Sequence, residues 1–227
     1  MTRAPTPSVN AAAPGALVIA CGALAQEIAA LRRINDWEAL DIQCLPPELH
    51  NRPERIPERV REAIRAARGR YAQIFVAYAD CGTGGRLDAV LREEGVDRLP
   101  GAHCYEFYAT AQRFSELAEQ EPGTFYLTDF LVRHFERLVA QTLGIDRHPE
   151  LIGEYFRNYR RVVYLIQDPA QSDVPAAQSI AQRLGLAFES RHTGYGELES
   201  SLRRAASRQV PATGATETPI EWATWRR

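Results

Sequence analysis

The sequence predicts an α/β protein whose β-strands run parallel, with helices packed on both faces of the sheet. Apolar runs of about five residues, typical of strands buried on both faces, alternate with longer stretches in which apolar residues recur at helical spacing. Such alternation indicates Rossmann-like βαβ repeats, because a helix must carry the chain back between parallel strands. The repeats are compatible with one doubly wound sheet or with two smaller lobes facing one crevice.

Seven strands are expected. The clearest are residues 74–78 and 162–166, which are aliphatic and aromatic throughout. The second strand stops at a Pro-Pro pair, which cannot continue a sheet. The expected strands, in order, are residues 16–20, 40–44, 74–78, 96–99, 125–127, 162–166 and 186–189.

The segments between these strands have helical periodicity. In the segment after the second strand, Ile56, Val60 and Ile64 mark the apolar stripe, and the opposite face consists of Arg and Glu. Gly95 is expected to end the short helix that precedes the fourth strand. The expected helices, in order, are residues 24–34, 56–64, 87–91, 104–119, 131–139, 149–159, 176–184 and a last one after residue 196.

Composition is that of an ordinary globular protein, with 45% hydrophobic and 25% charged residues among 227. We expect residues 15–207 to form a single domain, with two lobes meeting near residues 120–160 as the alternative. Residues 1–14 and 208–227 lack apolar periodicity and are expected to be disordered tails.

The charge balance limits the classes of partner. There are 27 basic and 29 acidic residues, for a net charge of −2, which argues against binding nucleic acid or an anionic membrane. Every basic residue is Arg, which excludes a Schiff-base lysine and the lysine of a phosphate-binding loop. The apolar stretch 11–24 is broken by Pro14 and Gly15 and is too short to span a bilayer.

Four cysteines are too few for a disulfide-rich secreted protein, so the sequence favours a cytoplasmic, thiol-reducing location. Residues 18–21 also resemble a lipoprotein cleavage site. The sequence after Cys21 continues directly into a helical pattern, where a lipoprotein would have a polar spacer. The cytoplasmic interpretation is therefore preferred.

Cysteines follow three of the expected strands: Cys21 the first, Cys81 the third and Cys104 the fourth. Because the carboxyl ends of parallel strands meet at one edge of a sheet, these thiols are expected to converge there. Thiolates bind Zn²⁺ or an iron–sulfur cluster, and His50 follows the second strand as a further ligand. The sequence therefore predicts a metal site of Cys21, Cys81, Cys104 and His50, with His103 as another candidate for the fourth position.

Two other interpretations of the thiols stay open. They could form a thiol active site without metal, or they could be buried cysteines with a structural role only. Cys44 lies in the middle of an expected strand and is assigned to the structural class.

Polar residues at the same strand ends are candidates for the remaining site functions. His103 and Glu106 flank Cys104 closely enough to act as catalytic acid or base, or as ligands. Glycines after Cys21 and Cys81 would let the backbone approach a bound group closely. The residues expected to contact the cofactor are Gly22, Gly82, Thr83, Thr128 and Asp129.

Five short motifs together resemble the family known as domain of unknown function 1638, over about residues 16–204. The resemblance implies a role beside corrinoid or one-carbon methyl-transfer metabolism. The motifs are residues 19–24 (IACGAL), 45–46 with 49–51 (LP and LHN), 78–82 (YADCG), 103–106 (HCYE) and 123–130 (GTFYLTDF).

The leading hypothesis is therefore a cytoplasmic zinc or iron–sulfur protein that serves this metabolism. As an enzyme it would be a metal-dependent methyl- or thiol-transferase acting on a small-molecule substrate. One alternative is a non-catalytic accessory protein or metallochaperone for a corrinoid methyltransferase system. The other is a metal-free enzyme that uses a Cys/His pair.

Overall fold

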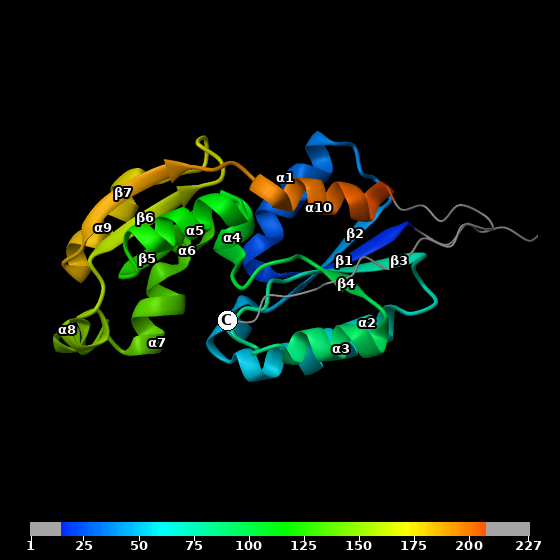
Figure 1. Ribbon diagram of the computed structural model, residues 1–227, viewed down its shortest axis with the longest axis horizontal. Coiled ribbons are helices and arrows are strands. Elements are labelled where there is room, and N and C mark those ends of the chain that lie inside the picture. Colours follow the sequence, from blue (N-terminus) through cyan, green and yellow to red (C-terminus); the bar gives the residue numbers. More distant parts are fainter. Residues whose placement is uncertain (1–14, 208–227) are drawn as a thin grey trace, which may run out of the picture.

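Residues 15–207 are described by the computed structural model, and they contain two parallel sheets (Figure 1). The expectations for 1–14 and 208–227 lie outside these residues. The first sheet has the strand order β2-β1-β3-β4, and the second has the order β5-β6-β7. The α/β prediction is confirmed, in the form with two smaller sheets. The strands are β1 (Ala16–Cys21), β2 (Leu40–Leu45), β3 (Gln73–Ala77), β4 (Asp97–Arg98), β5 (Thr124–Thr128), β6 (Arg161–Ile166) and β7 (Ala187–His192).

Helices cover both faces of the first sheet. In Figure 1, α2 and α3 lie below it, and α1 and α10 lie above it. The apolar stripe predicted from Val60 and Ile64 is fully buried against the sheet, and these two residues have no exposed surface. The helices of this part are η1 (Gly22–Leu24), α1 (Ala25–Ile34), η2 (Pro47–Asn51), η3 (Pro53–Arg55), α2 (Ile56–Ala67), α3 (Arg86–Glu94), α4 (Cys104–Ala109) and α10 (Gly196–Ser207).

The second sheet has its own set of helices. The single helix expected over residues 104–119 is two helices, because Thr110 has a φ of +67° that no α-helix accommodates. The chain therefore turns at Thr110 and leaves the first sheet. The helices around the second sheet are α5 (Ala111–Gln120), α6 (Asp129–Phe135), the π-helical turn η4 (Glu136–Ala140), α7 (Gln141–Leu143), η5 (Pro149–Leu151), α8 (Ile152–Tyr155) and α9 (Val174–Leu184).

Each sheet has a separate hydrophobic core, and we call the two parts the first lobe (residues 15–109 and 196–207) and the second lobe (residues 111–192). The last helix belongs to the first lobe, since Leu198 and Leu202 of α10 are fully buried in its core. The chain thus crosses between the lobes twice. The expectation of one domain over 15–207 stays a prediction.

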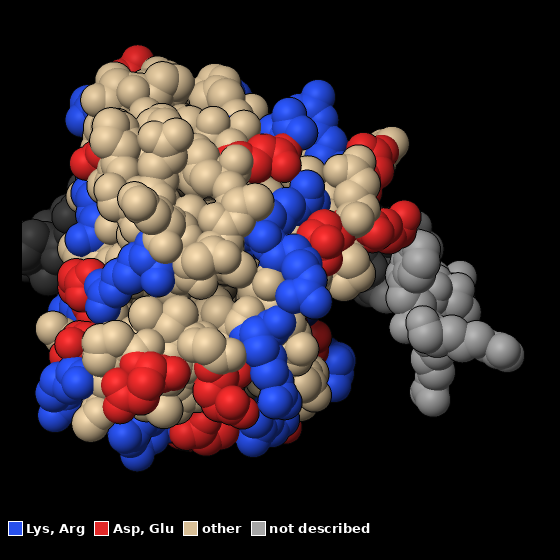
Figure 2. All heavy atoms as spheres, turned by 90° about the vertical axis from the view of Figure 1, so that its left-hand side faces the viewer, with Lys and Arg blue, Asp and Glu red and all other residues tan. Residues whose placement is uncertain are grey.

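The outer end of the second lobe carries charges of both signs. In Figure 2 a broad uncharged area occupies the upper half of this face, and acidic and basic side chains lie next to one another below it. Ion pairs such as Arg157–Glu154 and Arg183–Glu136 account for part of this mixing. Such exposed pairs contribute little to stability.

Close backbone contact at Gly196 holds α10 against α4. Gly196 has a φ of +50°, and a Cβ atom there would lie 2.2 Å from the carbonyl oxygen of Phe107. We expect Gly196→Ala to lower the free energy of unfolding by about 2–4 kcal/mol, because both the φ angle and the contact oppose a side chain. Urea unfolding followed by circular dichroism measures this.

Gly153 in α8 is the matched control, since no atom lies within 4 Å of the position its Cβ would take and its φ is ordinary. Gly153→Ala is expected to leave stability unchanged or raise it by about 0.5–1 kcal/mol. Equal unfolding midpoints for the two variants would contradict the proposed docking of α10.

Candidate functional site

Backbone hydrogen bonds bring two of the predicted cysteines together. Cys81 lies four residues after β3, and Cys104 is the first residue of α4. The amide of Asp80 donates to the carbonyl of Gly101 (3.1 Å), and the amide of Cys81 donates to the carbonyl of Ala102 (2.9 Å). These bonds fasten the loop after β3 to the segment that leads into α4, so the two thiols face each other.

The Sγ atoms of Cys81 and Cys104 are 3.3 Å apart, which is hydrogen-bonding distance, and we call these residues the thiol pair. Both side chains are buried. The hydrogen bond from Cys104 lowers the pKa of the Cys81 thiol, although burial opposes this. The same bond, together with burial, raises the pKa of Cys104. The pair therefore loses one proton more easily than an isolated buried thiol and holds the second more tightly.

Cys21, at the end of β1, is the third thiol of this region. Burial raises its pKa to about 11, so it is a neutral thiol at physiological pH. It lies close enough to the thiol pair to raise the pKa of Cys104 electrostatically, and the buried hydroxyl of Tyr78 adjoins it. Of the three thiols that the sequence places together, Cys81 and Cys104 contact each other, and Cys21 lies nearby.

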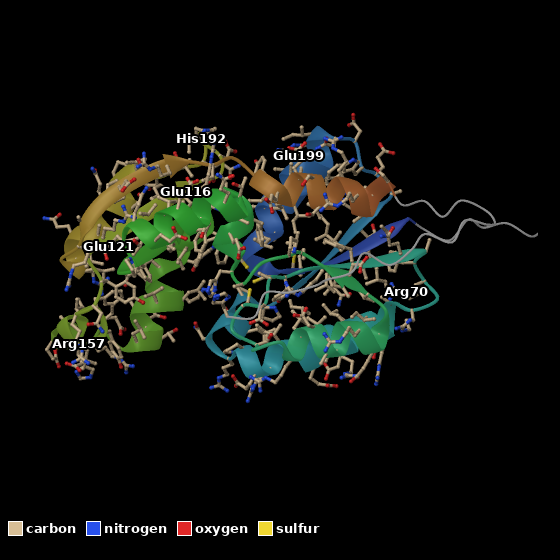
Figure 3. All side chains as sticks on the ribbon, in the orientation of Figure 1. Arg70, Glu116, Glu121, Arg157, His192 and Glu199 are labelled. Carbon is tan, nitrogen blue, oxygen red and sulfur yellow. The ribbon has the colours of Figure 1, made fainter. Side chains whose placement is uncertain are left out.

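A cavity of about 830 Å³, open to solvent, lies between the two lobes, and Cys104 forms part of its wall. We call it the inter-lobe cavity. In Figure 3 the yellow sulfur atoms lie in the middle of the molecule, whereas the labelled side chains, such as Glu116 and His192, lie at the periphery. The wall is mainly apolar and aromatic: Ala23, Leu24, Pro47, His50, Asn51, Cys104, Tyr105, Tyr108, Phe125, Thr128, Phe130, Leu131, Leu138 and Val139.

The two predicted histidines lie near each other, and one of them is on the wall of this cavity. His50 is the one on the wall. Loss of hydration where the protein covers its imidazole lowers the pKa of His50, and the neighbouring His103 lowers it further. His103 itself is exposed at the start of α4, with its ring centroid 6.5 Å from that of Tyr105. His50 is therefore neutral at physiological pH and can accept a proton.

The side chains of residues 15–207 include no group of three or more His, Cys, Asp or Glu arranged so that it could hold a metal ion. A site built from Cys21, Cys81, Cys104 and His50 would need these side chains to move toward one another. The four-ligand metal site, like the zinc or iron–sulfur cofactor, stays a prediction.

Several predicted site residues also have roles in the architecture. The carboxylate of Glu106 accepts a hydrogen bond from the amide of Ala102 (2.8 Å) and so holds the segment that leads into α4. The hydroxyl of Thr83 donates to Asp80 (2.6 Å), whose carboxylate also accepts the amides of Gly84 and Gly85. Burial opposes ionisation of Asp80, but these hydrogen bonds hold its pKa below the usual range. The turn that presents Cys81 is therefore rigidly braced.

The remaining predicted cofactor contacts are two glycines in the first lobe and two polar residues where α6 begins. Gly22 packs so closely on Pro47 that a Cβ atom would lie 2.8 Å from that ring, and Gly82 adopts a φ of +82°. Thr128 lines the inter-lobe cavity and caps α6 through the amide of Leu131. Asp129 is buried beside it, at the start of α6. Whether any of these contacts a cofactor stays a prediction.

The assignment of Cys44 to the buried structural cysteines is wrong, because this residue is exposed. The physical reason is that β2 is an edge strand of the first sheet and most of its inner residues face solvent. A sequence pattern cannot distinguish an edge strand from a central one, so the thiol was placed in the wrong environment.

Sequence reasoning missed the aromatic wall of the cavity. Tyr105 and Tyr108 come from α4, and Phe125 and Phe130 from the second lobe. The cluster of aromatic residues that directly follows Cys104 in the sequence was an available signal. Its partners are far away in the chain, so their convergence depends on how the lobes pack.

A family model described as protein of unknown function (DUF1638) matches residues 44–202. The chain belongs to this family. The match begins later than the resemblance suggested, so it includes the thiol pair and His50 but not Cys21. No curated protein and no solved structure matches the chain. Within the described residues of this DUF1638 protein, no helix has the length and apolar character needed to cross a membrane.

Asp129 offers a test of an architectural role at the predicted site. Its carboxylate accepts hydrogen bonds from the Tyr164 hydroxyl (2.6 Å) and from the amides of Gln167 (3.0 Å) and Asp168 (2.8 Å). Asp129→Ala leaves these donors without their acceptor, and we expect a loss of about 3 kcal/mol in the free energy of unfolding. Urea unfolding measures it.

Asp168→Ala is the control for this measurement. The Asp168 carboxylate is partly exposed and accepts hydrogen bonds only from Ala170 and Gln171, which are exposed neighbours in the same loop. We expect it to cost less than about 1 kcal/mol. If Asp129→Ala were no more destabilising than this control, the buried carboxylate would not have the structural role described.

Proposed function

We propose that the protein binds a small, largely apolar molecule in the inter-lobe cavity and that the thiol pair performs nucleophilic chemistry on it. The observation that carries this proposal is the 3.3 Å contact between the sulfur atoms, with Cys104 on the cavity wall. An aromatic, mostly apolar wall with a few polar groups is the usual composition of a small-molecule site.

The hydrogen bond within the thiol pair supplies the activation. When the pair has lost one proton, the negative charge lies mainly on Cys81, and Cys104 donates the remaining proton to it. Transfer of this proton to Cys81 during the attack makes Cys104, on the cavity wall, the thiolate nucleophile. Cys81 thus acts as the acid–base partner of Cys104, in the way that a neighbouring base activates a nucleophile in other thiol enzymes.

The proposed step is a group transfer. The Cys104 thiolate attacks an electrophilic carbon or sulfur of the ligand, a new bond to the Cys104 sulfur forms, and the leaving group departs with the bonding electrons. His50, neutral on the same wall, is placed to exchange a proton with the bound molecule or with the departing group. A second nucleophile then attacks the group bound to Cys104, the Cys104 sulfur departs as a thiolate, and the complete cycle is that of a thiol-dependent transferase.

Alkylation rates test the proposal. In a Cys44→Ser background, which removes the exposed thiol, Cys104 is expected to react with iodoacetamide at neutral pH faster than Cys21. Adding Cys81→Ala should slow this labelling about tenfold or more, because Cys104 loses the partner that takes its proton. Mass spectrometry of the labelled peptides gives the rates.

Cys21→Ala is the matched control, because it removes a buried neighbouring thiol without removing the hydrogen bond of the thiol pair. It should leave Cys104 labelling within about twofold of the parent protein. Labelling of Cys104 that is unaffected by Cys81→Ala would contradict the proposed activation.

A thiophilic metal centre is the second candidate function. It is favoured by the third thiol, Cys21, which lies close to the thiol pair. In a tetrahedral zinc site the sulfurs are about 3.8 Å apart, as Zn–S bonds of about 2.3 Å require, so the pair would have to open by roughly half an ångström. The metal would make the protein a metal-dependent transferase or an accessory protein of corrinoid or one-carbon methyl transfer.

Metal analysis after anaerobic reconstitution with zinc, or with iron and sulfide, distinguishes the two candidates. A metal centre predicts stoichiometric metal that is lost in Cys21→Ser and retained in Cys44→Ser. Metal well below one per chain in the parent protein would contradict it. Both candidates need free thiols, which all four cysteines have in the structure, and we propose a cytoplasmic location on that ground.

A further inference from the structure

A second hollow between the lobes, which we call the polar pocket, shares no lining residue with the inter-lobe cavity. It is a shallow hollow with about 210 Å³ of space between its atoms, part of which is open solvent. Ionisable side chains from both lobes line it: Glu27, Asp129, Arg133, Asp168 and Tyr195. None of these residues takes part in the proposed thiol chemistry, so the pocket needs an explanation of its own.

Glu27 is the unusual member of this set. It lies in the first turn of α1, yet only 5% of its surface is exposed. Its Oε2 atom has no hydrogen-bond partner among the described residues. Burial raises its pKa to about 7, while Arg133 lowers it and Asp129 raises it. A buried carboxylate oxygen without a donor is costly, so a ligand that supplies one would be bound favourably.

The charges around Glu27 are mainly negative. Asp129 and Asp168 come from the second lobe, and Arg133 on α6 is the only cation among the pocket's lining residues. Burial raises the pKa of Tyr195 and the three carboxylates raise it further, with Arg33 on α1 opposing them. Burial and Glu27 likewise raise the pKa of Tyr108 on α4. The potential in the pocket therefore favours a positive ligand.

The carboxylates of Asp129 and Asp168 already accept hydrogen bonds from protein donors. Both oxygens of Asp129 accept protein donors, and the Asp168 carboxylate accepts from Ala170 and Gln171. The Arg133 guanidinium donates to the side chain of Gln26 (2.6 Å), and Oε2 of Glu27 receives no hydrogen bond from it. Among these carboxylates, Oε2 of Glu27 is thus an oxygen that still lacks a donor.

We propose that the polar pocket is a binding site for a small organic ammonium ion, held by a hydrogen bond from its N–H group to Oε2 of Glu27. The neighbouring carboxylates of Asp129 and Asp168 stabilise its charge. A metal ion fits less well, since no three-ligand group exists within residues 15–207. The proposal does not depend on the function proposed for the thiol pair.

Titration with n-propylammonium chloride at constant ionic strength, followed by amide NMR of the full-length protein, tests this site. At about pH 8, where Glu27 is ionised, binding is expected to shift amides of residues that line the polar pocket. At about pH 5.5 the affinity should fall about tenfold or more, because a protonated carboxyl cannot accept the N–H group in the same way.

Glu27→Gln keeps the size of the side chain and removes its charge. It should weaken propylammonium binding about tenfold at pH 8 and abolish the pH dependence. Glu58→Gln is the matched control, since Glu58 also lies in the first turn of a helix but is exposed. It should leave the affinity unchanged.

Arg133→Gln provides an independent variant, because removing the one cation of the lining should tighten propylammonium binding by a few-fold. Sodium propionate and tetramethylammonium chloride are the ligand controls. Propionate that binds as tightly as propylammonium would contradict the charge assignment, and equally tight tetramethylammonium would contradict the hydrogen bond. An affinity unaltered in Glu27→Gln would overturn the site.

The unfolding equilibrium gives a readout that does not need a ligand. The folded pKa of Glu27 lies above its ordinary value of 4.5, so the folded state binds this proton more tightly than the unfolded state. The parent protein should therefore lose stability relative to Glu27→Gln as the pH rises from about 4.5 to about 7, and propylammonium should restore part of it. Parallel stability profiles for the two proteins would contradict the buried, unpartnered carboxylate.

Discussion

The candidate site depends on two backbone hydrogen bonds, from Asp80 to Gly101 and from Cys81 to Ala102. They join the loop after β3 to the entrance of α4, and the sulfur contact follows from them. The Asp80 carboxylate and Glu106 brace this junction from either side. Glu106, a candidate ligand or catalytic residue in the sequence, thus helps to position the thiols.

The second constraint is that the chain crosses between the lobes twice. It leaves the first lobe at Thr110 and returns through α10, whose apolar residues complete the first core. The lobes are therefore held facing each other, and both hollows lie between them. One is apolar and has a thiol on its wall, and the other is polar and has a buried carboxylate. A small molecule bound in either would contact both lobes.

The sequence was sufficient for the parallel topology and for the approach of Cys81 to Cys104, because strand ends in such sheets meet at one edge. It was not sufficient for features decided by packing. The exposure of Cys44 on an edge strand and the burial of Glu27 depend on segments distant in the chain, and no helix-breaking residue type marks the break at Thr110. First-turn glutamates are common, and no local pattern marks the one that becomes buried.

Disulfide mapping after mild oxidation tests the contact at the centre of this account most directly. In Cys44→Ser protein treated with stoichiometric diamide, which takes two electrons and two protons from a dithiol, the contact predicts one product. The peptides containing Cys81 and Cys104 should be joined to each other, with Cys21 still a free thiol. A Cys21 disulfide, or adducts on separate cysteines without a Cys81–Cys104 link, would show that the two sulfurs are not neighbours.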